Sequence, residues 1–321
     1  MSAVPGGGRW LHCVVPDLLQ VPTGWRAPRL RRLESLLVRG RSAPGPLGLT
    51  AALFDAFEVP PEARVAAPWR RMGSGAEPGP EWVAQAHPVH FRPDRDRLLL
   101  FPLHREPEAE TAQALAHRFD DHFSGKGLRL EIRGPGRWFL VADTPQEVRF
   151  TALSQVPEVG LERAMPQGTG ARFWRQVLTE TQMLVHGLME ARRGVGTDFG
   201  FNGLWFDDAG VVARPLGRAP EWVLPPPDDP LALGLSAHVA ERAPDRRLLL
   251  ATEVAEAVAA EDPDRWRSAL NALESALETE IARGVEEIRL DACDGRRRSM
   301  APRRAGRFWR RRRPLERIAG R

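Results

Sequence analysis

The sequence predicts an α/β fold whose core is interrupted by an α+β subdomain, and three observations favour this class. A short apolar strand at 10–15 is followed by an amphipathic helix at 29–39. A strand pair, a helix and a hairpin succeed one another between residues 85 and 145. Two long amphipathic helices follow, at 171–193 and 264–283.

Residues 1–57 are predicted to form the N-terminal part of the core. Pro16 ends the strand at 10–15, since proline cannot donate a backbone hydrogen bond. Four leucines recur at helical spacing within 29–39, and Gly40 ends that helix. A second apolar stripe predicts a helix at 47–57.

Residues 58–145 are predicted to form the inserted α+β subdomain. It begins with a Pro- and Gly-rich loop at 72–80. Two strands within 89–103 then flank a polar turn, a helix follows at 106–123, and a hairpin at 128–142 closes the unit.

Residues 146–294 are predicted to return to the core and to contain its long helices. The stretch 143–170 is rich in proline and glycine, so we interpret it as the crossing between domains. The further elements expected are a strand at 204–206, a helix at 229–242 that begins at Asp228 or Asp229, a strand at 247–251, and a hairpin that starts at 287.

Composition indicates a globular protein. The chain has 321 residues, of which 42% are hydrophobic and 27% charged. No apolar run reaches the roughly 18–20 residues of a membrane span. The N-terminus does not resemble a signal peptide, so we expect a cytoplasmic protein without membrane contact. Cys13 and Cys293 are then expected to be free thiols.

The C-terminal segment 295–321 is strongly basic. It contains twelve arginines against a single acidic residue, Glu316, while the rest of the chain is net negative. Such a charge density attracts polyanions, and Phe308 and Trp309 could stack on bases. In the alternative interpretation the segment packs on the protein and its arginines pair with acidic side chains. We favour the alternative, which makes nucleic-acid binding through this segment the less favoured hypothesis.

Three histidines and two aspartates lie around the first predicted hairpin: His87, His90, His104, Asp94 and Asp96. A metal ion needs about four ligands that converge on one point. On one strand His87 and His90 would point to opposite faces, and aspartates are common in turns for conformational reasons. We therefore expect no metal site here.

Other catalytic patterns are weak. Asp207 and Asp208 are adjacent, but neighbouring side chains at a strand end diverge, so we expect a turn rather than an acid–base pair. The Gly-rich segments 5–8 and 194–203 match neither common phosphate-loop pattern, and no nucleophile elbow is present.

Several segments, in order, resemble the bacterial RpfE-type regulatory proteins over nearly the whole chain. They are VVPDLL, LRRLESLLVRG, HPVHFRPDRDRLLLF, LTETQMLVH, FNGLWFDDAG, DDPLALGLSA and RFWRRRRPL. The most specific parts are the helix that contains Gln182 and the strand Asn202–Trp205. That family usually has NSLWLWGGG where this chain has NGLWFDDAG, which loses a Trp and two glycines.

The chain also resembles the archaeal-type cofactor-independent phosphoglycerate mutases, which belong to the alkaline-phosphatase-like superfamily. The similar parts are the helix at 28–40, the HFRPD strand and Asn202–Trp205. The resemblance implies a reduced alkaline-phosphatase-like core, with Asp17 where those enzymes have their first metal-binding aspartate. It also implies that His90, Arg92, Asn202 and Trp205 line a ligand site.

Those mutases use a phosphorylated serine and two metal ions, and this chain departs from their pattern. No serine that matches theirs follows the first strand, and their PPHD motif would fall at 144–147, where the sequence is TPQE. Their late Asp-Gly-His motif has no counterpart. The resemblance therefore implies a scaffold that has lost its chemistry.

We accordingly expect a non-catalytic regulatory or interaction protein, without a cofactor, that binds a protein partner or a phosphorylated metabolite. The alternative is a divergent mutase or phosphohydrolase that uses Mn²⁺ or Mg²⁺. In that case Arg92 would bind the phosphate, and Asp17 would be the candidate catalytic residue.

Overall fold

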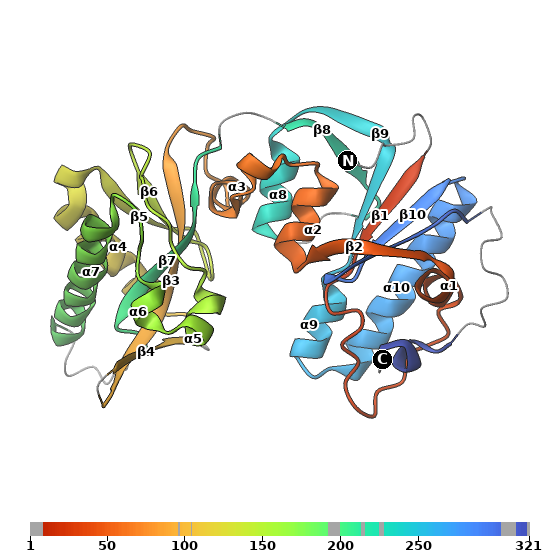
Figure 1. The fold of residues 1–321 in the computed structure, drawn as a ribbon, viewed down its shortest axis with the longest axis horizontal. Helices are drawn as coiled ribbons and strands as arrows, with labels where there is room; N and C mark the ends of the chain where they lie inside the picture. Colours follow the sequence, from red (N-terminus) through yellow and green to blue (C-terminus); the bar gives the residue numbers. More distant parts are fainter. Residues whose placement is uncertain are drawn as a thin grey trace. The chain divides into compact units, whose positions relative to one another are not determined.

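The computed structural model divides the chain into two compact units, whose elements are labelled in Figure 1. Unit 1 combines residues 1–64 with 215–321, and unit 2 consists of residues 65–214. The structure describes residues 9–95, 97–103, 105–191, 200–212, 216–224, 228–302 and 313–319. Unit 2 is therefore an insertion in the sequence of unit 1.

Within the described residues, unit 1 contains a six-stranded mixed sheet with strand order β2-β11-β10-β1-β9-β8. The central strand β1 runs parallel to both β9 and β10, and β8 is parallel to β9. The edge formed by β11 and β2 is antiparallel. The strands are β1 Trp10–Val14, β2 Arg41–Leu47, β8 Leu216–Trp222, β9 Val239–Leu250, β10 Glu287–Asp291 and β11 Asp294–Met300.

Helices cover both faces of this sheet (Figure 1). The side chains of Leu11, Cys13 and Val15 form one buried cluster with apolar residues of α1, α9 and α10. The opposite face of β1 carries His12, because successive side chains of a strand alternate, and α2 and α8 lie on that side. The helices are α1 Arg31–Arg39, α2 Leu49–Ala56, α8 Pro230–Ala237, α9 Glu253–Ala259, α10 Pro263–Ala282 and α11 Leu315–Ala319, with a 3₁₀ turn at Pro61–Ala63.

Unit 2 is built on β3 Trp82–Asp94, which pairs with three other strands, all antiparallel. Its first part pairs with β6, its last part pairs with β4, and β7 pairs with its middle. The hairpin partner of β6 is β5. The bounds of these strands are β4 Arg97–Pro102, β5 Leu128–Ile132, β6 Trp138–Ala142 and β7 Gly203–Gly210.

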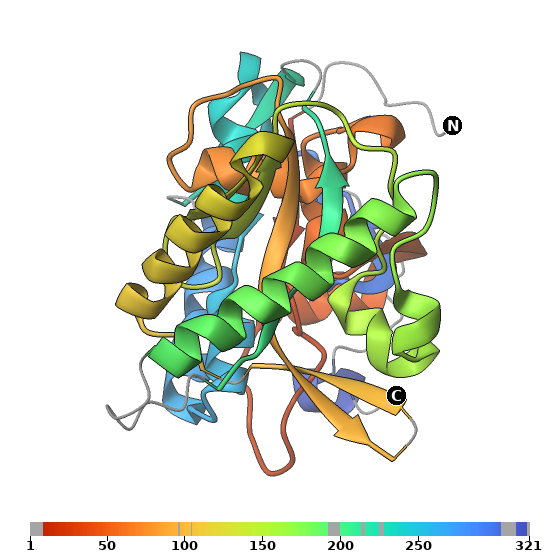
Figure 2. The ribbon, with the colours of Figure 1, turned by 90° about the vertical axis from the view of Figure 1, so that its left-hand side faces the viewer.

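The two long helices α4 and α7 lie across one face of the unit 2 sheet, as Figure 2 shows. They enclose a core that includes Phe119, Leu140 and Val177. The helix α3 packs on the other face, where Ala67 contacts a small cluster with Val83 and Val141. The helices are α3 Ala66–Gly73, α4 Ala109–Phe123, α5 Val156–Val159, α6 Leu161–Ala164 and α7 Ala171–Ala191, with 3₁₀ turns at Ser124–Lys126 and Leu153–Gln155.

The predicted class, an α/β core with an inserted α+β subdomain, is confirmed by these two sheets. The insertion is longer than expected, because β7 pairs with β3 and α7 packs on the same core. Residues 146–214 therefore belong to unit 2, and 143–170 is not a crossing between the units.

The prediction for 229–242 was only half right. Asp229 is the N-cap, since its Oδ1 accepts a hydrogen bond from the Ala232 amide at 2.8 Å, but the helix ends at Ala237. The residues that follow form β9, which pairs with β8 and then with β1. Pairing with two strands outweighs the local helical preference.

A buried carboxylate fixes the start of α1. Leu30, at the N-cap, has no side-chain oxygen that could accept from the first helical amides. Glu274 of α10 takes that role, because its two oxygens accept from the amides of Arg32 at 2.6 Å and Leu33 at 3.0 Å. These are the donors that an N-cap side chain normally satisfies, and the negative charge suits the positive end of the helix.

Replacing Glu274 by alanine should therefore lower the free energy of unfolding by about 1–3 kcal/mol, because one buried and one partly buried amide lose their acceptor. Urea unfolding followed by circular dichroism measures this loss. The matched control is Glu278→Ala, since Glu278 is exposed on the same helix and should change stability by less than about 0.5 kcal/mol. Equal effects of the two substitutions would contradict a capping role.

Candidate functional site

Asn202, predicted to line a ligand site, binds the backbone of β3. Its Oδ1 accepts from the amide of Phe91 at 2.7 Å, and its Nδ2 donates to the carbonyl of the same residue at 2.8 Å. Its own amide donates to the carbonyl of Val89 at 3.1 Å. The side chain therefore acts as an additional rung of the β3–β7 ladder, just before β7 begins.

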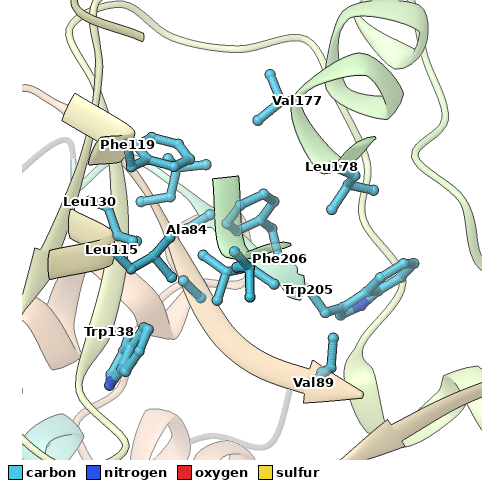
Figure 3. Close-up of a cluster of buried hydrophobic side chains, with 14 of the residues drawn as sticks. Ala84, Val89, Leu115, Phe119, Leu130, Trp138, Val177, Leu178, Trp205 and Phe206 are labelled. Atoms are coloured by element: carbon cyan, nitrogen blue, oxygen red, sulfur yellow. The ribbon is translucent and has the colours of Figure 1, made fainter. Parts of the chain in front are cut away.

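The next residues of this segment are also used in packing. A Cβ atom on Gly203 would lie 2.7 Å from the ring of Phe91, so this position accepts only glycine without a shift of the ring. Trp205 is 1% exposed and its indole N–H donates to the carbonyl of Thr151 at 2.9 Å. Figure 3 shows its ring in the core of unit 2, near Val89 and Leu178.

His90 and Arg92 lie on the other side of β3 from this core. In the register with β4 they stand opposite Phe101 and Leu99. The guanidinium group of Arg92 is 4.6 Å from the ring centroid of Phe101, a cation–π contact on an exposed surface. The structure thus places these two residues on one face of a hairpin, while Phe91 between them points into the core with Trp205.

Asp207 and Asp208 diverge, as predicted, but they lie within β7 rather than in a turn. Asp207 contacts His87 at 2.8 Å and accepts from the amide of Leu153 at 2.7 Å. Asp208 accepts from the amide of Ala66 at 2.9 Å, at the start of α3. Burial raises the pKa of Asp208, and this effect exceeds the opposing one of that amide. Both carboxylates therefore attach β7 to neighbouring segments.

Asp17 follows β1 in unit 1. Its backbone is left-handed, with φ of 55°, and its Oδ1 accepts from the side-chain amide of Gln20 at 2.7 Å. Cys293 follows β10, and Thr252 follows β9. These residues mark the carboxyl ends of three parallel strands, where open α/β sheets commonly bind ligands. Burial and nearby carboxylates raise the pKa of the Cys293 thiol to about 12, so it stays protonated and is a weak nucleophile.

A chain of buried ionic contacts starts at the carboxyl end of β10. Asp291 is fully buried, and its Oδ2 lies 2.6 Å from Nε2 of His12. Arg297 of β11 holds both oxygens of the same carboxylate, with its Nε 3.0 Å from Oδ1 and its Nη2 2.6 Å from Oδ2. Arg297 also reaches Asp55 of α2 at 3.2 Å, and Asp55 contacts Arg64 at 2.7 Å.

The protonation states of this chain follow from burial and charge. Burial lowers the pKa of His12 below its ordinary 6.5, against the opposing effect of Asp291, so the imidazole is neutral and donates its Nε2–H. Burial opposes ionisation of Asp291, but the hydrogen bonds from His12 and Arg297 outweigh it and hold the pKa of that carboxyl below its usual range. The result is a neutral histidine beside an arginine–carboxylate pair.

Among the residues that the structure describes, no three or more His, Cys, Asp and Glu side chains gather in a group that could hold a metal ion. Asp96 and His104, two members of the cluster weighed above, lie outside the described residues, as do the Gly-rich residues 5–8 and 194–199.

The first part of the basic C-terminal segment is part of unit 1. Arg297 binds Asp291, and Arg298 contacts Asp294 at 2.9 Å. Further along, the side chain of Leu315 is buried against the core. These contacts agree with packing of the segment on the protein. Residues 303–312, with Phe308 and Trp309, lie outside the described residues, so polyanion binding stays a prediction.

No protein-family model matches the sequence, and no curated protein matches it either. Solved structures that are similar to it include the following two. The cofactor-independent phosphoglycerate mutase from Thermoplasma acidophilum matches with a TM-score of 0.46 and 15% identity, covering 91% of this chain and 89% of that chain. The PH0037 protein from Pyrococcus horikoshii matches with a TM-score of 0.50 and 12% identity, covering 97% and 92%. The second likeness shows a shared fold, and at these identities neither bears on chemistry.

None of the described helices is both long and apolar enough to cross a membrane.

The contacts of Asn202 lead to a stability prediction. Asn202→Ala should lower the free energy of unfolding by about 1–3 kcal/mol, because the amide and carbonyl of Phe91 lose their partners. Thermal or urea unfolding checks this. Gln155→Ala, an exposed amide in the same unit, should stay within about 0.5 kcal/mol of the wild type. A stable Asn202→Ala protein would instead indicate a residue reserved for a ligand.

The depressed pKa values of His12 and Asp291 predict that acid destabilises the protein. The unfolded chain takes up a proton at the histidine near pH 6.5, whereas the folded protein resists it, so stability falls as the pH falls below that value. Asp291 adds a second loss at lower pH, through the ordinary carboxyl range near 3.8.

The slope at the histidine should reach up to about 1.4 kcal/mol per pH unit between about pH 7 and pH 5. Chemical unfolding at a series of pH values measures it. His12→Gln should flatten the profile in this range, whereas His186→Gln, which alters an exposed histidine, should leave it unchanged. Parallel profiles for wild type and His12→Gln would exclude this assignment.

Proposed function

We propose that this protein is a non-catalytic regulatory protein, of the kind that the RpfE-type resemblance implies, which acts by binding a partner on a phosphoglycerate-mutase-like scaffold. The observation that supports this most directly is the state of Asp291. This carboxylate lies at the carboxyl end of a central parallel strand, and a guanidinium group and a histidine occupy both of its oxygens.

Two-metal phosphotransfer requires carboxylates and histidines whose lone pairs face the metal ions. Arg297 supplies the positive charge beside Asp291, and His12 is a donor to it rather than a ligand. Asp55 is likewise held by arginines. A buried carboxylate with such partners is strongly stabilised in place, since withdrawal of one partner from a buried ion pair costs about 3–5 kcal/mol.

The alternative is a divergent mutase or phosphohydrolase that uses Mn²⁺ or Mg²⁺. One observation favours it: Asp17 lies at the carboxyl end of β1, is partly exposed, and its Oδ1 accepts a hydrogen bond from the side chain of Gln20. Its position is one where a carboxylate could meet a ligand. We rank this proposal second, because the neighbouring Asp291 is already paired.

A turnover assay separates the two proposals. The full-length protein, incubated with 3-phosphoglycerate and with Mn²⁺ or Mg²⁺, should show no conversion above the buffer background. Thermal unfolding with the same ions should show no shift, whereas a ligand of the folded state at about 100 times its Kd would add about 2.7 kcal/mol.

Asp17→Ala and the control Asp264→Ala, which removes an exposed carboxylate of α10, test any activity that is found. Turnover that survives further purification and disappears only in Asp17→Ala would replace the non-catalytic proposal with the enzyme.

A further inference from the structure

An open groove of about 1160 Å³ runs along β4 in unit 2. The strand residues 97–101 form one side of it. The opposite side comes from the short helices α5 and α6, with Val156, Leu161 and Met165. Figure 2 shows the hairpin of β3 and β4 extending beyond the long helices α4 and α7. The lining does not include His90, Arg92, Asn202 or Trp205, the residues expected to form a ligand site, but it does include Asp94 of the cluster considered for a metal ion.

The groove follows the backbone edge of β4. Successive side chains of a strand point to opposite faces of the sheet. The groove is lined by the five consecutive residues 97–101. It therefore contacts both faces of β4 and the backbone edge that lies between them. Among the described strands β4 pairs with β3 alone, and it is the last strand of the sheet on this side. A strand at the edge of a sheet presents backbone donors and acceptors that can pair with another chain.

This edge lacks the usual protection against pairing. Native edge strands carry charges, prolines or bulges that prevent another strand from adding. Here Arg97 and Pro102 occur only at the two ends of the strand, and the four residues between them are Leu-Leu-Leu-Phe. Leu98 and Phe101 are each 38% exposed. An apolar edge of this kind in a folded protein indicates a surface that is covered by a partner.

The charges around the groove favour an acidic partner. Its lining includes three arginines, Arg95, Arg97 and Arg163, against two acidic residues. One of these acids, Asp94, already contacts Arg97 at 3.3 Å. Outside the lining, Arg92 adds a further positive charge over the ring of Phe101. A second copy of this chain would bring the same excess of arginine to the contact, whereas a segment with carboxylates would offset it.

We propose that the groove binds an extended segment of a partner protein, in which apolar residues are flanked by acidic ones, as a strand added to β4. Backbone hydrogen bonds would supply affinity, while the apolar residues and the arginines of the lining would select the side chains of the partner segment. The six residues of β4 span roughly 20 Å, which suits a segment of about six residues. This inference rests on the proposed function, because it names the class of partner that a non-catalytic binding protein would take.

The test starts from a library of random peptides of about eight residues, displayed on phage and selected on the full-length protein. Enriched sequences should alternate apolar residues and carry aspartate or glutamate at their ends. Synthetic copies with a fluorescent label are then titrated in an anisotropy assay. Copies that are N-methylated at alternate residues should bind at least about ten-fold more weakly, because they cannot donate to a strand edge.

Two variants locate the binding. Arg163→Glu and Leu98→Asp should each weaken the peptide by about ten-fold or more, and unchanged circular dichroism confirms that both are folded. Arg172→Glu makes the same charge change on an exposed residue of α7 outside the lining and should bind like the wild type. Equal binding by all variants, equal binding of the methylated peptide, or failure of any peptide to enrich would overturn the proposal.

Sedimentation velocity tests whether a second copy of this chain occupies the groove instead. The wild type should be monomeric at micromolar concentration, and a dimer that Leu98→Asp dissociates would assign the groove to a second copy and overturn the proposal. The turnover assay keeps the two conclusions separate. Failure of the peptide experiments with no turnover removes only the groove, whereas turnover lost in Asp17→Ala removes the proposed function.

Discussion

The arrangement of unit 1 depends on the need to neutralise one fully buried carboxylate, Asp291. An isolated charge in such a place would cost several kcal/mol, and removal of a partner from a buried pair costs about 3–5 kcal/mol. Its partners come from β1, through His12, and from β11, through Arg297. The same arginine reaches Asp55, which ties α2 to the sheet. The contacts of this one carboxylate therefore connect the central strands β1 and β10 with the antiparallel strand β11 and, through Arg297, with the helix α2.

In unit 2 a neutral side chain, that of Asn202, supplies the hydrogen-bond partners of backbone groups. The strand β3 of this unit is long enough to pair with three strands, and the β3–β7 ladder would leave the backbone of Phe91 without partners just before β7 begins. Asn202 supplies one acceptor and one donor there, in the geometry of a backbone amide. Gly203 then allows the Phe91 ring to lie against the strand. The Asn-Gly pair in this segment is explained by packing and hydrogen bonding.

The helices were predictable because their signal is local. The apolar stripes of α1, α4, α7 and α10 follow from residue spacing within each segment. The strand β2 was not predicted, since its sequence RSAPGPL shows little apolar alternation. The strand β11 was expected as the second strand of the hairpin that starts at 287, and its antiparallel pairing with β10 confirms this. The segment of β2 is a strand because it pairs with β11, which is far from it in the sequence. Pairing over such separations leaves no trace in a local pattern.

The candidate site was predictable only in part, for the same reason. The resemblance drew attention to Asn202 and Trp205, but their roles depend on contacts with Phe91 and Thr151, more than fifty residues away in each case. The contact of His12 with Asp291 spans 279 positions, and neither residue belongs to a recognisable motif. The groove was missed because its second side lies in 143–170, a stretch whose composition indicates a loop.

The two units differ in which groups remain available to a ligand or partner, and this difference bears on function. In unit 1 the charged side chains at the carboxyl end of β10 are withdrawn into ion pairs, which leaves little free charge there to hold a ligand. In unit 2 two apolar side chains of β4, Leu98 and Phe101, are each 38% exposed, and among the described strands β4 pairs on one side only. Stability alone would favour charges or proline at such an edge, since these prevent association. Retention of an open apolar edge is therefore better explained by binding than by folding.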